Sequence, residues 1–383
     1  MPAHKMRDGL VQRGSTWSFV VREQDPETGR KKSRWVGGFA TMAEARKARD
    51  AARHATNRGT FVAPATITAG EYLDRWIDAH EVGLKPSTAI SYRANINRYL
   101  RPALGHERLQ SLSPSRLSVL FRDLYEHGGK HGAPLSPRTV EFARAVLRRA
   151  LQDAVVDRLV EVNPVIGTKR PRTVKPKHTT WTAAQLRSFL AQLDDEHRWT
   201  PLWELAAGTG MRRGELLALR WSDIDLEHGL IRVERSVTQI ARTRSYGTPK
   251  NHEHREVALD DHLVSTMKTW RTKQVGERLV LGESYLDGED LVFTWQDGRP
   301  VPPDFVTSTF GRLTTDLEVP RLTFHSLRHT HATLLLREGV PVHVVAKRLG
   351  HKDPSVTLSV YADAIPDDDS RAVETFTKAV WGT

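Results

Sequence analysis

Six side chains in the second half of the chain are of types that can act together on a phosphodiester. They are Arg212, Lys250, His325, Arg328, His351 and Tyr361. His325 and Arg328 stand three residues apart where a helix should begin, so they share one face of its first turn. The set contains two arginines and neither an acidic base nor a metal-ligand pattern, which favours electrostatic stabilisation of a phosphate over metal catalysis.

Local sequence signals predict where these side chains stand. Arg212 follows a Gly-Thr-Gly break, and Glu215, three residues later, supports it at the start of a leucine-rich helix. Lys250 is predicted at the tip of a loop between two strands, from which a lysine can reach a ligand. His351 follows a helix-terminating glycine and Tyr361 lies about two turns along the next helix, so we expect the two to be neighbours.

A phosphodiester under attack gains negative charge, and arginine offers paired donors to its non-bridging oxygens. We therefore expect Arg212 and Arg328 to clamp the phosphate, with a further hydrogen bond from His351. A tyrosine has a pKa near 10, so Tyr361 needs a cationic field or a neighbouring base before it can attack phosphorus.

The arginines and His325 are expected to supply that field and the proton transfer, and Lys250 is the predicted general acid for the leaving deoxyribose oxygen. Taken singly, each residue also fits an ordinary structural role, such as a core tyrosine, a helix-ending histidine or a solvated lysine. Three further histidines are interpreted as structural because no partner residues argue for more: His329, His331 and His343.

Periodicity predicts a multidomain α+β chain. Residues 180–383 should form a mixed, mainly α domain with a small antiparallel sheet and a C-terminal tail helix. The helices are predicted in 182–193, 199–221, 327–339, 341–350 and 354–364, and the strands in 229–237 and 255–260. Four amphipathic helices, in 66–80, 85–105, 113–129 and 136–160, should make a small bundle within residues 63–168.

The first 60 residues are basic, with 13 Lys and Arg against 6 Asp and Glu. Residues 15–23 and 31–39 are predicted strands, and Thr41 should cap the helix that follows, giving a three-stranded sheet plus a helix over residues 1–62. A basic sheet with exposed Arg and Trp can enter a DNA groove; the alternative is a structural appendage kept soluble by its charges.

The segment 169–179 is predicted to be a basic linker, because residues 168–178 hold five basic residues, two prolines and no acid. It can lie along a phosphate backbone or serve as a solvated hinge. Candidate DNA contacts share a basic or hydroxyl side chain in these N-terminal and linker regions. They are Arg22, Arg34, Lys85, Ser87, Thr88, Arg93, Lys169, Arg170 and Arg172.

Composition sets the limits on function. The chain of 383 residues is 39% hydrophobic and 27% charged, as expected for a soluble globular protein, and a formal charge of +11 favours a polyanionic partner. Zero cysteines exclude disulfides and thiolate chemistry. We find no stretch of roughly 20 apolar residues and no signal peptide, so we expect neither a membrane span nor export.

In these motifs the chain resembles the tyrosine recombinases, also called the phage integrase family. The family pattern of Arg, Lys, His-x-x-Arg, His or Trp, and Tyr is similar at all six positions, in "TGMRRGELLALRWSDID", "TPKNHEHREV", "HSLR", "LGH" and Tyr361. Upstream, "YLDRWI" and "ALQDAVVDRLVEVNP" resemble the family's helical core-binding (SAM-like) domain, and the N-terminal sheet resembles an arm-type DNA-binding domain. Ser326 stands where members often carry Asp, and it can still cap the helix.

The resemblance implies a site-specific recombinase that needs no ATP, metal or other cofactor. Tyr361 would join a DNA 3′ phosphate, release a 5′ hydroxyl and pass strands through a Holliday junction. A homotetramer would hold double-stranded DNA at core and arm attachment sites, in the bacterial cytoplasm at the nucleoid. The arm domain favours an integrase of a temperate phage or integrative element, with a host DNA-bending protein and an excisionase as candidate partners.

Three alternatives stay open from the sequence: a chromosome or plasmid resolving recombinase, a type IB topoisomerase-like enzyme, and a DNA-binding regulator with a decayed site. Because all six positions are filled, decay is the weaker hypothesis. The tail carries Val373, Phe376 and Val380 at helical spacing, which predicts a helix that docks into a neighbouring protomer or packs on its own domain.

Overall fold

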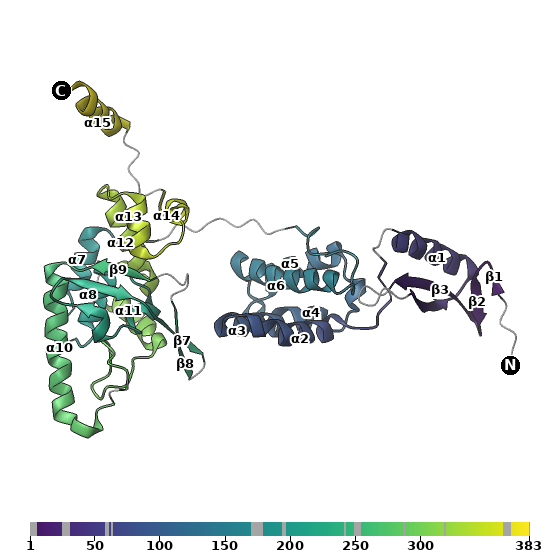
Figure 1. Cartoon of the computed structure of the whole chain (residues 1–383), viewed down its shortest axis with the longest axis horizontal. Helices are drawn as coiled ribbons and strands as arrows, with labels where there is room; N and C mark the ends of the chain where they lie inside the picture. The colour runs from purple at the N-terminus through teal and green to yellow at the C-terminus, as the bar shows by residue number, and fades with distance from the viewer. Residues whose placement is uncertain are drawn as a thin grey trace. The chain divides into compact units, whose positions relative to one another are not determined.

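The computed structural model describes residues 6–24, 31–57, 61–62, 64–169, 179–193, 197–240, 243–248, 254–286, 288–317, 319–362 and 369–382. The chain divides into two compact units, residues 1–175 and 176–383, each of which is described by itself (Figure 1). The predicted fold class is confirmed: a small antiparallel sheet with a helix, a helical middle, and a mainly helical C-terminal part with small sheets.

The N-terminal sheet is antiparallel, and one helix packs against it (Figure 1). Its elements are β1 (Met6–Arg7), β2 (Leu10–Arg13), β3 (Thr16–Gln24), β4 (Lys31–Phe39) and α1 (Met42–Asn57). Thr41 caps α1 as predicted, because its hydroxyl accepts from the Glu44 amide and the Glu44 carboxylate accepts from the Thr41 amide, both at 3.2 Å. The sheet has four strands rather than the predicted three, since β1 is too short to show alternation in the sequence.

The helical middle is a bundle around one apolar core. Its segments are α2 (Ala69–His80), η1 (Glu81–Gly83), α3 (Pro86–Asn95), the π-helical turn η2 (Ile96–Leu100), α4 (Arg101–Leu104), η3 (Leu109–Ser111), α5 (Pro114–His127), η4 (Lys130–Gly132) and α6 (Pro137–Val156). The predicted face of α2 is buried, namely Tyr72, Leu73, Trp76 and Ile77. Ser113 and Ser136 cap α5 and α6, while the predicted helix 85–105 is interrupted by η2.

The C-terminal unit combines helices with two small sheets, and α10 runs along one side of the unit (Figure 1). Its helices are α7 (Ala183–Ala191), α8 (Thr200–Thr209), α9 (Arg213–Leu216), η5 (Trp221–Asp223), α10 (Asp261–Leu281), η6 (Gly282–Ser284), α11 (Pro303–Asp316), α12 (Phe324–Arg337), α13 (Val342–Leu349), α14 (Pro354–Tyr361) and α15 (Asp369–Trp381). Its strands are β5 (Ile224–Asp225), β6 (Leu230–Val233), β7 (Ser236–Ile240), β8 (Thr243–Gly247) and β9 (Arg255–Ala258).

The sequence interpretation of this unit was incomplete. The predicted strand 229–237 is two strands in different sheets, because β6 pairs with β5 and β9 whereas β7 forms a hairpin with β8. The predicted helix 199–221 ends at Gly210, which adopts a left-handed φ of 64°, and resumes as the short α9. The long helices α10 and α11 were not predicted. In the part of the chain that the structure describes, no helix has the length and apolar character to cross a membrane.

Candidate active site

The site is built on the ion pair between Arg212 and Glu215. Arg212 stands at the N-cap of α9, where its Nη1 donates to Glu215 Oε1 at 2.8 Å and its backbone N–H donates to Oε2 at 2.9 Å. Arg255, at the start of β9, donates to the same carboxylate at 2.7 and 3.2 Å. Burial alone would raise the pKa of Glu215, but the hydrogen bonds and charges of Arg255 and Arg212 bring it down to about 2.

Arg328 is held by neutral acceptors. Its Nη1 donates to the carbonyl of Gly210 at 2.8 Å, and its Nη2 donates to the carbonyl of Leu349 at 2.7 Å and to His351 Nε2 at 2.9 Å. Only 3% of this residue is exposed. Burial, and then the neighbouring charge of Arg212, lower the pKa of Arg328 to about 9, so the guanidinium remains protonated at neutral pH.

Two glycines in the left-handed conformation shape the cage formed by Arg212, Arg255, Arg328 and Glu215. Gly210 ends α8 and Gly350 ends α13, with φ values of 64° and 68°, and their carbonyls accept from Arg328 and Arg212 respectively. A Cβ at Gly350 would lie 2.9 Å from an Arg255 nitrogen, and one at Gly210 would lie 2.8 Å from a buried histidine ring. Both positions therefore need glycine for conformation and for space.

His351 is a neutral imidazole with a defined tautomer. Because a guanidinium can only donate, Nε2 accepts from Arg328 and Nδ1 carries the proton that it donates to Thr357 Oγ1 at 2.7 Å. Burial and the charges of Arg328 and Arg212 lower the pKa of His351 to about 4. For the predicted hydrogen bond from His351 to a phosphate, Nε2 would have to give up Arg328 and gain a proton. In the present arrangement His351 therefore positions Arg328.

Tyr361, the last residue of α14, points its hydroxyl at a histidine of α12. The Oη atom lies 2.7 Å from His329 Nδ1, and the ring centroids are 5.5 Å apart. The residue is 4% exposed. Burial raises the pKa of Tyr361 to about 12, although the charges of Arg328 and Arg212 oppose the rise. The arginine field expected to activate this tyrosine is thus outweighed by desolvation.

His325 is exposed in the first turn of α12, and its ring lies edge-on to that of His329 with the ring centroids 4.9 Å apart. Lys250 lies outside the described residues, so its predicted role as general acid stays a prediction. Ser326 does not cap α12; its hydroxyl is 2.8 Å from that of the N-cap residue Thr323.

The candidate DNA contacts are only partly described. Lys85, Ser87 and Lys169 are exposed and Thr88 is half-buried. Arg93 donates to Glu81 and Asp78 at 2.8 and 2.7 Å, so a phosphate would have to displace two carboxylates. Arg170 and Arg172, and the side chains of Arg22 and Arg34, lie outside the described residues. On the N-terminal sheet, the Arg13 guanidinium stacks 4.0 Å over the half-exposed ring of Trp35.

Three family models match the N-terminal sheet with its helix, the helical middle and the C-terminal unit. The phage integrase family matches residues 180–367, its N-terminal SAM-like domain matches 68–120, and an arm DNA-binding domain matches 10–52. The chain belongs to the phage integrase family. It is therefore a tyrosine recombinase with arm, SAM-like and catalytic domains.

Two curated relatives match over most of their length. A tyrosine recombinase described as XerC-like, from Caldanaerobacter subterraneus subsp. tengcongensis, is 28% identical over 88% of this chain and 89% of its own. The ICEBs1 integrase of Bacillus subtilis is 23% identical over 96% of both chains.

Solved structures share the recombinase fold. The Tn1549 transposon integrase bound to circular intermediate DNA has a TM-score of 0.68 at 21% identity, over 81% of this chain and 99% of that one. A lambda integrase tetramer bound to a Holliday junction has a TM-score of 0.58 at 20% identity, over 95% and 98%.

Two residues that contact the predicted site residues carry little signal in the sequence. Arg255 joins Glu215 from a distant strand, and its only local signal is a basic residue at the start of a predicted strand. His329 was interpreted as structural, yet it contacts the tyrosine hydroxyl. Its position directly after Arg328, one turn beyond His325, is the signal that could have found it.

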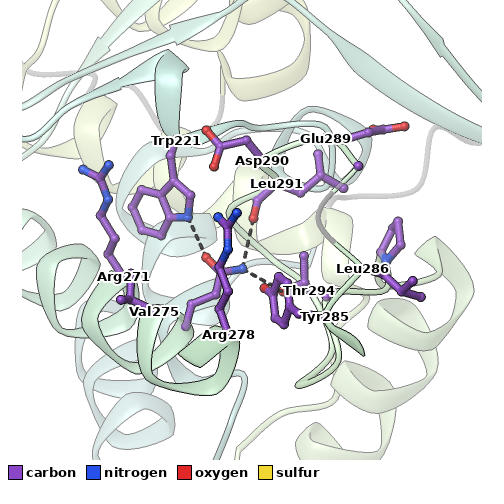
Figure 2. Close-up of a pocket in the computed structure, with 14 residues that line it drawn as sticks. Trp221, Arg271, Val275, Arg278, Tyr285, Leu286, Glu289, Asp290, Leu291 and Thr294 are labelled. Atoms are coloured by element: carbon purple, nitrogen blue, oxygen red, sulfur yellow. Dashed lines mark hydrogen bonds between the residues drawn. The ribbon is translucent and has the colours of Figure 1, made fainter. Parts of the chain in front are cut away.

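A separate cavity of about 340 Å³ in the recombinase's C-terminal unit lies beside η5 and α10 (Figure 2). Trp221 Nε1 donates to Gln274 Oε1 at 2.6 Å, and Gln274 Nε2 donates to the Leu291 carbonyl at 3.1 Å and to Thr294 Oγ1 at 2.7 Å. None of the six predicted catalytic residues is among the described residues that line it. This polar network ties α10 to η5 and to the loop that contains Leu291 and Thr294.

Proposed function

We propose that this recombinase is an integrase that cleaves and rejoins DNA through a 3′-phosphotyrosyl bond to Tyr361. The observation that carries the proposal is the convergence of Arg212 at the N-cap of α9, Arg328 of α12, His351 just after α13 and Tyr361 of α14 on one cationic site. Such a cage suits a phosphorane because its donors are already in place before charge develops.

The proposed roles follow from the contacts. Arg328 and Arg212 bind the non-bridging oxygens, and Glu215 fixes Arg212 by two hydrogen bonds. Tyr361 attacks phosphorus, the bond from phosphorus to the 5′ oxygen breaks, and Lys250 protonates that oxygen. The phosphotyrosyl bond keeps the phosphodiester energy, so a second 5′ hydroxyl can reverse the step on another strand without ATP.

The remaining parts of the proposal concern the assembly. The domain bounds are 1–62 for arm binding, 63–168 for core binding and 180–383 for catalysis, with the basic linker 169–179 along the backbone. Four protomers hold two attachment sites and resolve a Holliday junction, and an excisionase reverses integration. The basic N-terminal part supports this, since phosphate neutralisation supplies much of the affinity for DNA.

The C-terminal helix α15 is proposed to dock on a neighbouring protomer. Its predicted apolar residues Val373, Phe376 and Val380 are 59%, 62% and 51% exposed, and Trp381 beside them is 69% exposed. The catalytic unit carries an apolar groove whose lining includes leucines and three carboxylates, and we propose this groove as the site that receives the helix. The lining includes Leu186, Leu190, Glu204, Asp260, Leu263, Leu334, Leu335 and Glu338. Deleting residues 370–383 should abolish synapsis while single-site binding remains; unchanged synapsis and activity would contradict the docking.

The test of the function is covalent trapping. Nicked suicide duplexes made from the DNA flanking the gene should give a protein–DNA adduct on denaturing gels with wild type. Tyr361→Phe should bind the same duplexes equally and give none. Specific binding without an adduct from wild type would contradict the proposed cleavage and favour a regulator. Supercoil relaxation without site preference would instead favour a type IB topoisomerase, and recombination of paired sites in cells would favour the integrase.

A further inference from the structure

The hydroxyl of Tyr361 faces a base that lies outside the six-residue family pattern. His329 projects from α12 so that its Nδ1 lies 2.7 Å from Oη. With burial raising the pKa of Tyr361 to about 12, almost none of this phenol is ionised at neutral pH. A group that accepts the proton of Oη should therefore increase the rate of attack on phosphorus strongly.

The other described groups of the site are poorly suited to accept its proton. Arg212 and Arg328 are donors only. His351 uses Nε2 to accept from Arg328 and Nδ1 to donate to Thr357, and Glu215 is bound by two arginines.

The ring of His325 lies edge-on to His329 at 4.9 Å, on the exposed side of α12. The hydroxyl of Tyr361 forms its hydrogen bond with His329 Nδ1.

We propose that His329 is the general base that takes the proton of Tyr361 during cleavage and returns it during religation. The inference rests on the proposed function, since it assigns a step of that reaction. The neutral ring carries its proton on Nε2 and accepts the phenol proton at Nδ1. The Oη–phosphorus bond forms, the bond to the 5′ oxygen breaks, and that oxygen takes a proton from a different acid, Lys250 in the proposed mechanism. In religation each transfer runs in reverse.

The first experiment measures single-turnover adduct formation by full-length protein on the suicide duplex across a range of pH. His329→Asn keeps an acceptor oxygen near the place of Nδ1 but cannot take a proton. It should bind the duplex as wild type does and cleave it on the order of 10²–10⁴-fold more slowly. His343→Asn, the same change at an exposed position of α13, is the matched control and should cleave like wild type.

The pH profile separates a base from a merely structural contact. Wild type should level off once its imidazole is neutral. His329→Asn should instead gain roughly tenfold in rate per pH unit, because hydroxide must ionise a phenol that titrates well above the tested range. If His329→Asn were slower than wild type by the same factor at every pH, the general-base role would be overturned, and His329 would only position Tyr361.

A 5′-bridging phosphorothiolate duplex gives a second measurement, since a thiolate leaves without a proton. This substrate should restore cleavage by Lys250→Ala and leave His329→Asn slow. If this substrate restored cleavage by His329→Asn, the histidine would act on the leaving group instead of on Tyr361. A wild-type cleavage rate of His329→Asn on the ordinary duplex would also overturn the proposal. Absence of an adduct from wild type on both duplexes, despite specific binding, would instead refute the proposed function.

Discussion

Replacing Glu215 by glutamine tests whether one buried carboxylate organises the arginines of the site. Its pKa falls from the ordinary 4.5 to about 2 in the folded protein, because Arg255 and Arg212 together outweigh the effect of burial. At about 1.4 kcal/mol per pKa unit, the ionised group contributes about 3 kcal/mol to folding at neutral pH. Removing one partner of a buried pair costs about 3–5 kcal/mol, so the two approaches agree.

The sign of the pH dependence follows from the lowered pKa. The contribution of Glu215 is fully present above pH 4.5 and is lost as pH falls toward about 2. Glu215→Gln should therefore destabilise the catalytic unit near pH 7 and should lack this part of the acid destabilisation. Hydrogen exchange of peptides from α9 and β9 in the full-length protein gives the opening free energy, and calorimetry between about pH 7 and about pH 3 gives the slope.

The matched control is Glu256→Gln, the same change one residue after Arg255. Glu256 pairs with Arg232 at 3.6 Å, and both side chains are more than 60% exposed. Such a surface pair contributes about 0–1 kcal/mol, so this variant should stay near wild type. Equal losses in the two variants, or an unchanged acid slope in Glu215→Gln, would refute the buried-carboxylate reasoning.

Three further outcomes can be measured independently. Deleting residues 1–60 should make DNA binding less dependent on salt, because fewer phosphates are neutralised; an unchanged slope in a titration would contradict the arm role. Arg328→Lys should cleave on the order of 10²–10³-fold more slowly in single-turnover assays, since an ammonium cannot replace the guanidinium fork; a wild-type rate would exclude the clamp. Burial lowers the pKa of His331 to about 4 from 6.5, so stability should decline as pH falls through that interval, and His331→Gln should flatten the calorimetric curve.

The positions of Arg212 and His351 beside helix-ending glycines were predictable from the sequence, because glycine is a backbone signal. Glycines 210 and 350 mark the helix ends, and the structure shows that their carbonyls hold the arginines. His329 and Arg255 were not predictable in the same way. A single histidine or arginine in an amphipathic segment has many structural roles, and only the fold brings Arg255 from β9 to Glu215 on α9.

The missed elements have different causes. The strand β1 has two residues, which is too few for any alternation, and β6 and β7 are separated only by Glu234 and Arg235, too short a break to divide the predicted strand. The helix α10 did carry a readable pattern, since its buried residues Leu263, Met267, Trp270 and Gln274 recur at spacings of four, three and four. Polar residues between them hide this stripe in an overall hydrophilic segment.

The charge balance of the site explains why neutral groups hold Arg328. Three guanidinium groups, of Arg212, Arg255 and Arg328, surround the single carboxylate of Glu215 in the described part of the cage. Two of them pair with that carboxylate, while Arg328 binds two carbonyls and His351. A carboxylate partner would neutralise Arg328 and compete with a ligand, whereas carbonyl and imidazole partners fix its orientation and leave its charge uncompensated. The cost appears as the lowered pKa of Arg328, and an anion such as a DNA phosphate is the ligand that would offset it.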